Sequence, residues 1–119
     1  MNYLPSKELL SEVLGHKVWK VLGCNMGTLR YCIYPNKGDE PSEYIFPINI
    51  YELASKCKEW AYRQGYVLLS GYSTYGVGLF FCSCKGWVSE NYDKKIEITH
   101  NTEPEAIFKA CQWILDNKD

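Results

Sequence analysis

The chain has 119 residues, of which 46% are hydrophobic and 23% are charged, and its formal net charge is −1. This composition is that of an ordinary globular protein, and it excludes an intrinsically disordered chain. The length suits one domain over residues 1–119, and the lack of a basic excess argues against a dedicated nucleic-acid-binding protein.

The first part of the chain predicts a helix, a hairpin and a loop. Residues 4–15 carry an apolar stripe at helical spacing, which begins after the capping residue Ser6. Residues 17–23 and 28–34 flank the short segment CNMG, so we expect two strands joined by a tight turn. Residues 35–47 contain three prolines and a glycine, and they predict a loop.

The second part predicts a helix, three strands and a last helix. The first of these helices starts at the capping residue Asn49, carries an amphipathic pattern and ends before Gly65. Thr102 and Glu105 form a capping box that starts the last helix. The three strands between the helices are predicted at residues 66–72, 76–84 and 94–100.

The strand that contains GLFFCSC indicates how the elements pack. Cys82 and Cys84 alternate with Phe81 and Ser83, and both faces of the strand are largely apolar. A strand that is apolar on both faces is usually covered on both. We therefore predict an α+β fold: a single-domain, three-layer alpha-beta-alpha sandwich with a mostly antiparallel sheet and the element order α-β-β-α-β-β-β-α.

The cysteines raise the question of thiol or metal chemistry. Cys82 and Cys84 would need further ligands for zinc, such as His100, but the spacing lacks the paired motifs of zinc sites. A catalytic thiol would need a partnered base. We therefore interpret the two cysteines as reduced, small core residues, and predict a protein that is no enzyme and has no cofactor; a thiol- or zinc-dependent enzyme is the competing hypothesis.

The tyrosines favour binding. The chain has 10 tyrosines, and Tyr72 and Tyr75 fall in or beside a predicted hairpin loop. Tyrosine offers a large contact area at a low entropic cost, so these two residues are our candidate contacts to a partner protein. A nucleic-acid or nucleotide-binding module that uses Lys17, Lys20 and Arg30 is the second hypothesis, and basic residues clustered with tyrosine on one exposed sheet face would support it.

The order of elements over residues 49–117 is also that of the double-stranded RNA-binding module. That module needs a basic start to its last helix in order to contact phosphates. This sequence has Glu103 and Glu105 there, which would repel a phosphate backbone. The charge therefore argues against RNA as the partner.

Three segments resemble the small phage and prophage proteins of the phage ABA-sandwich domain family. They are ELLSEVLG, NIYELASKCKEWAYRQGY and NTEPEAIFKACQWIL, and the last contains a T-x-P-x-A-I-x-x-A pattern. The resemblance implies an alpha-beta-alpha sandwich and a viral or prophage origin, and it transfers no catalytic residue. It leads us to expect an accessory protein that binds a host or phage protein and in one version blocks a host defence system.

The sequence also bears on the location of the protein in the cell and on its oligomeric state. No segment approaches the roughly 18 apolar residues of a membrane span, and the first residues lack an apolar signal segment. We therefore expect a cytoplasmic protein in a host cell, with no membrane partner. A homodimer would follow if an edge strand is left unpaired, for instance a strand of the hairpin at residues 17–34.

Overall fold

The computed structural model describes residues 3–34, 45–74 and 76–118. In chain order the elements are α1 (Lys7–Leu14), β1 (Val18–Asn25), β2 (Thr28–Ile33), β3 (Ile45–Asn49), α2 (Ile50–Arg63), β4 (Tyr66–Tyr72), β5 (Phe80–Gly86), the 3-10 helix η1 (Ser89–Asn91), β6 (Lys95–His100) and α3 (Glu103–Asp116).

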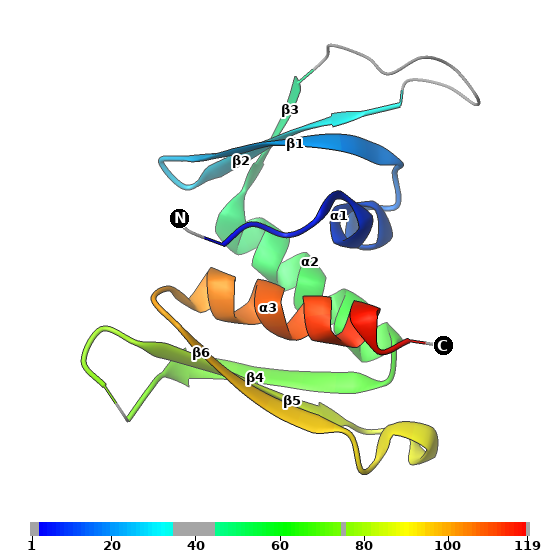
Figure 1. The fold of residues 1–119 in the computed structure, drawn as a ribbon, viewed down its shortest axis with the longest axis vertical. Helices are drawn as coiled ribbons and strands as arrows, with labels where there is room; N and C mark the ends of the chain where they lie inside the picture. Colours follow the sequence, from blue (N-terminus) through cyan, green and yellow to red (C-terminus); the bar gives the residue numbers. More distant parts are fainter. Residues whose placement is uncertain (1–2, 35–44, 75, 119) are drawn as a thin grey trace.

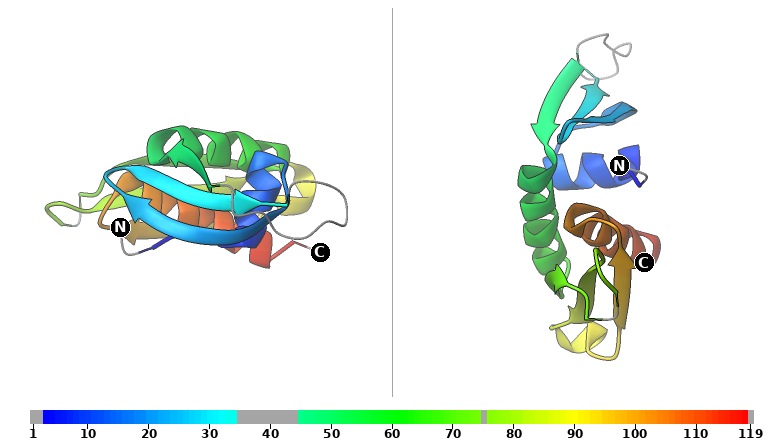
Figure 2. Two further views of the ribbon diagram at one scale, coloured as in Figure 1. Left: turned by 90° about the horizontal axis from the view of Figure 1, so that it is seen from above. Right: turned by 90° about the vertical axis from the view of Figure 1, so that its left-hand side faces the viewer.

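The strands form two antiparallel sheets with the helices between them (Figure 1). Sheet A has the strand order β1-β2-β3, and sheet B has the order β4-β5-β6. Helix α1 packs on sheet A, whereas α2 and α3 pack against each other and on sheet B. Helix α2 runs from β3 of sheet A to β4 of sheet B and so links the two layers of strands (Figure 2).

The α+β class and the antiparallel pairing are confirmed, but the layers differ from the prediction. Instead of one sheet between helices, the described strands form two sheets, and both α2 and α3 lie on the same face of sheet B. The predicted order also lacks one strand, since Ile45–Asn49 pairs with β2. Pro47 concealed this strand in the sequence; a proline is tolerated there because β3 is at the edge of sheet A. The earlier part of the predicted loop, residues 35–44, lies outside the described residues.

The predicted helix caps are confirmed. The hydroxyl of Ser6 accepts a hydrogen bond from the backbone N–H of Leu9 at the start of α1. The side chain of Asn49 accepts from the backbone N–H groups of the first turn of α2, and Thr102 accepts from that of Glu105 in α3. These contacts satisfy N–H groups that have no partner inside the helix.

Apart from Cys32, the buried hydrophobic side chains of the described residues form one cluster that runs through both sheets and all three helices. Leu29 represents sheet A in this core, Leu53 and Trp60 come from α2, and Phe108 comes from α3. The described helices include none that is long and apolar enough to cross a membrane.

A candidate binding surface on sheet B

The two cysteines of β5 belong to the core, as predicted. Cys82 and Cys84 are fully buried and face the helices. Burial raises the pKa of each thiol to about 12, so both are protonated at neutral pH and are poor nucleophiles. Among the described residues no three His, Cys, Asp or Glu side chains lie close enough together to hold a metal ion. His100, the third member of the competing metal hypothesis, instead contacts Glu105.

The opposite face of sheet B is open. Leu69 is 64% exposed and Val67 is 39% exposed, although both lie within a strand. The expectation that helices cover both faces of this sheet is therefore wrong. We call this surface the outer face; it consists of Val67, Leu69, Gly71, Phe81, Ser83, Lys85, Lys95, Glu97 and Thr99.

The register places the apolar and charged groups of the outer face in separate regions. Leu69 pairs with Ser83 on the central strand, and Ser83 pairs with Glu97 on β6. The apolar side chains therefore lie over β4 and the end of β5 near Phe81, while the charges lie over β6 and the other end of β5, where Lys85 pairs with Lys95. The arrangement is an apolar patch with a charged rim on one side, as in many protein interfaces.

Aromatic residues lie at both ends of β4. Tyr62 of α2 stacks on Trp87 with ring centroids 4.8 Å apart, and the Trp87 indole N–H donates a hydrogen bond to the carbonyl of Tyr62. At the other end, the ring centroids of Tyr72 and Phe80 are 4.9 Å apart. Beside each end is a shallow depression, one of about 190 Å³ next to Trp87 and one of about 170 Å³ next to Tyr72.

The structure describes one of the two candidate tyrosines. Tyr72 is 80% exposed, at the end of β4, so its ring is available to a partner. Tyr75 lies outside the described residues. The sequence did not single out Leu69 or Val67. The sequence feature that points to this region is a segment without charged residues, between Arg63 and Lys85.

The three candidate basic residues do not form one group. Arg30 alternates on β2 with the core residue Tyr31 and so points away from the helices. Lys20 pairs with Cys32 on that same face of sheet A, outside the hydrophobic cluster. Lys17 lies before β1, with its ammonium 4.7 Å from the Tyr34 ring centroid. Tyr31, the neighbour of Arg30 on β2, faces the core, so among the described residues it does not join Lys20 and Arg30 on the exposed face of sheet A.

A hollow with a volume of about 720 Å³ lies between α1, the start of β1 and the end of α3. Its lining mixes charges of both signs, and some of these are already engaged. Glu12 forms an ion pair with Lys118 at 2.9 Å, and this hydrogen bond lowers the pKa of the Glu12 carboxyl. Lys17 is held over Tyr34. The lining therefore favours no one class of ligand.

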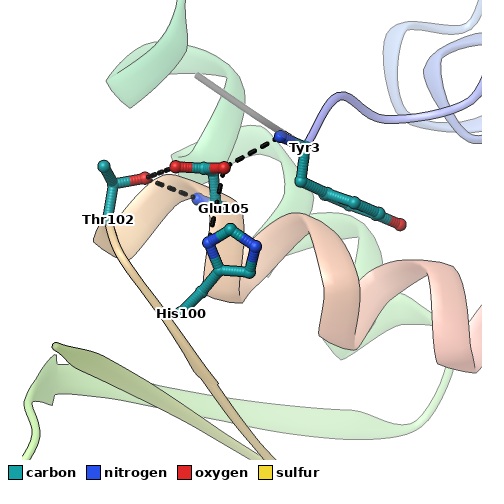
Figure 3. A network of polar contacts seen from close by, with 4 residues as sticks. All are labelled: Tyr3, His100, Thr102 and Glu105. Carbon is teal, nitrogen blue, oxygen red and sulfur yellow. Dashed lines mark hydrogen bonds and ion pairs between the residues drawn. The ribbon is translucent and has the colours of Figure 1, made fainter.

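A buried carboxylate joins the start of the chain to sheet B and α3 (Figure 3). Glu105 is 2% exposed and accepts hydrogen bonds from the backbone N–H of Tyr3 at 2.9 Å and from the hydroxyl of Thr102 at 2.7 Å. The Nδ1 atom of His100 lies 3.3 Å from the same carboxylate, close enough for an ion pair but not aligned as a hydrogen bond. Because the carboxylate is occupied by these contacts, its role is to hold the fold together.

No protein-family model, curated protein or solved structure matches this chain. The resemblance to the phage ABA-sandwich family therefore stays a prediction from the sequence, and the functional argument rests on the geometry of the outer face.

Proposed function

We propose that this chain acts by binding another protein, without catalysis, and that the outer face of sheet B is its contact surface. The exposure of Leu69 carries the proposal. An exposed apolar patch with charges beside it marks an interaction site more often than a random surface does. The regular pairing of sheet B keeps this patch on one continuous strand surface.

The charges of the outer face support a protein rather than a nucleic acid as the partner. Lys85 and Lys95 are accompanied by Glu97 on the same face. A nucleic-acid site would need a predominantly basic surface to neutralise phosphates. Lys20 and Arg30 are together on sheet A, but two cations are few for that purpose.

The resemblance to phage proteins suggests the setting of this interaction. On that basis the partner is a host or phage protein in the cytoplasm of an infected cell, and the chain works by covering part of it. Blocking a host defence system is the version of this function that we favour, since a small protein needs no catalytic group to occlude a surface.

The proposal is tested by placing a photo-crosslinking amino acid at position 69 in cells that make the protein. The control carries the same amino acid in place of Tyr51 of α2, which is 63% exposed and so matches Leu69 in accessibility. We expect a crosslinked product with a second protein from position 69 only. A product at twice the chain mass of 13.8 kDa would report self-association and is counted separately.

A second variant tests whether that product depends on the outer face. Ser83 is at the centre of this face, so Ser83→Arg places a bulky charge there without touching the core. We expect the crosslinked product with the second protein to disappear. A product that persists in the Ser83→Arg protein, or one that forms equally from position 51, would refute the outer face as the binding site.

A further inference from the structure

Among the described residues the two sheets have four edge strands, β1 and β3 in sheet A and β4 and β6 in sheet B. The outer side of an edge strand presents unpaired backbone N–H and C=O groups, which are able to pair with another chain. Proteins usually protect such edges with bulges, prolines or charged side chains. The four edges of this protein differ in that respect.

Three of the edges are protected. The pairing of β1 with β2 has two irregularities, one on each side of Lys20 and Val21, and β1 also carries the charge of Lys20. Strand β3 contains Pro47, which has no backbone N–H to offer. Strand β6 carries Lys95 and Glu97. Each of these three strands therefore has a bulge, a proline or charged side chains that hinder pairing with another chain.

Strand β4 has no such protection. Its sequence is YVLLSGY, and it pairs with β5 in an unbroken register from Tyr66 opposite Gly86 to Tyr72 opposite Phe80. It contains neither a charged residue nor a proline. Within the described residues no strand pairs with its outer side. A regularly paired, uncharged edge that contains exposed Leu69 would be a site of uncontrolled association if nothing occupied it.

We propose that a second copy of this chain occupies the β4 edge, so that two β4 strands pair antiparallel and join the two sheets B into one. The strand suits its own copy. Leu69 is the midpoint of Tyr66–Tyr72, so a two-fold axis there allows the whole strand to pair. Leu69 then lies beside its own counterpart, and Val67 lies beside the small Gly71 of the other copy. No like charges meet across the pair, because β4 has none.

This inference goes beyond the proposed function and does not depend on it. It assigns self-association to β4 rather than to the hairpin at residues 17–34, which the sequence suggested as an example. The pairing would bring two outer faces into one continuous surface and would cover the side chain of Leu69 from one side. A partner protein would then meet a surface of two-fold symmetry.

Sedimentation velocity on the reduced protein, from low micromolar to near-millimolar concentration, tests the pairing. We expect a monomer–dimer equilibrium, and we expect Leu69→Lys to raise its dissociation constant at least about tenfold, because two ammonium groups replace two adjacent apolar side chains. The matched control is Ser83→Arg, on the same face but on the central strand, which should leave the dimer intact.

Each alternative outcome contradicts the pairing. A monomer over the whole range shows that the edge has no second copy on it. A dimer that withstands Leu69→Lys is held elsewhere, and a dimer that Ser83→Arg abolishes is formed by stacked faces. If the chain is monomeric but still crosslinks to a second protein from position 69, the self-pairing fails while the proposed function stands.

A chemical crosslink gives a second readout that does not rely on weakening the dimer. Directly opposed residues of an antiparallel pair have Cβ atoms about 4.5–5.5 Å apart, close to the spacing of a disulfide. Leu69→Cys should therefore form a disulfide-linked dimer on mild oxidation, and Thr99→Cys, on the charged β6 edge, should not. Equal crosslinking of the two variants would overturn the proposed register.

Discussion

Sheets A and B have the same connectivity, a three-stranded antiparallel meander, but opposite degrees of regularity. In sheet A the pairing of β1 with β2 shifts between Val18 and Lys20 and again between Val21 and Gly23. In sheet B the pairing is continuous in both ladders. Irregular pairing bends a strand and increases its twist. The β1 edge of sheet A is therefore poorly suited to pairing with another strand, whereas β4 of sheet B is regularly paired and no described strand pairs with its outer side.

The inner faces differ as well. Sheet A presents large side chains to the core, including Leu29 and Tyr31. Sheet B presents the small Cys82 and Cys84 from its central strand, while its edge strand β4 adds the larger Tyr66 and Leu68. Helices approach a sheet closely where the sheet supplies small side chains. The central strands of the two sheets therefore contribute side chains of different size to the core.

The largest expected effects come from truncating buried side chains, and they test whether the core unfolds as one unit. Phe108→Ala should cost about 3–5 kcal/mol and Leu29→Ala about 2–5 kcal/mol of unfolding free energy, because each removes a fully buried side chain. Urea titrations followed by circular dichroism and by tryptophan fluorescence measure both. Since the buried residues form one cluster, we expect coincident single transitions. Two separated transitions in Leu29→Ala would show that sheet A unfolds on its own.

The next effect concerns the polar link between the start of the chain and the sheet B half. Glu105→Ala should cost about 2–3 kcal/mol, because it leaves the Tyr3 N–H and the Thr102 hydroxyl without their acceptor. The control is Glu12→Ala, which breaks an exposed pair with Lys118 and should cost about 1 kcal/mol at most. The same urea titrations compare them, and equal losses would contradict the role assigned to Glu105.

The sequence predicts local structure better than the arrangement of sheets. The caps at Ser6, Asn49 and Thr102 are local contacts between residues three or fewer apart, and the structure has all three. The alternation around Cys82 shows only that two faces exist; which face the helices cover depends on contacts between distant elements. For the same reason the exposure of Leu69, which carries the candidate surface, could not be predicted from YVLLSGY alone.

At alkaline pH the buried cysteines of sheet B should lower the free energy of unfolding. The pKa of Cys82 and of Cys84 is raised by burial from 9.0 to about 12. Between pH 9 and pH 12 the unfolded chain releases thiol protons that the folded chain retains. The contribution of the protonated thiols to the free energy of unfolding is therefore fully present below pH 9 and is lost as the pH rises toward 12. Urea midpoints at several pH values across this window measure the slope.

Replacing both buried thiols isolates their contribution. The double variant Cys82→Ala, Cys84→Ala should be less stable at neutral pH but should lose less stability than the wild type between pH 9 and 12. Cys24→Ala, at a partly exposed position of β1 in sheet A, is the control for removing a thiol outside the buried part of sheet B. An unchanged slope in the double variant would show that other groups cause the alkaline loss.

The smallest expected effects come from replacing one strand glycine in each sheet with alanine, at Gly23 of sheet A and Gly71 of sheet B. Neither position blocks an added methyl group: nothing lies within 4 Å of a Cβ at Gly23, and at Gly71 the nearest contact is an ordinary 3.5 Å to the Phe81 ring. The backbone differs, because Gly23 has a φ of +130°, which residues other than glycine rarely adopt. Gly23→Ala should therefore destabilise by about 1–2 kcal/mol, while Gly71→Ala should be neutral or stabilise by up to about 1 kcal/mol.

Thermal unfolding of these two variants separates backbone strain from packing, since both substitutions add the same methyl group to a strand. A loss confined to Gly23→Ala would show that the irregular pairing of β1 is a fixed feature that only glycine permits. If both variants are equally stable, β1 is able to relax toward regular pairing and the β1 edge is less protected than its register indicates. In that case the choice of β4 for self-association would rest on the charges of Lys20, Lys95 and Glu97 and on Pro47 of β3, and no longer on the shape of β1.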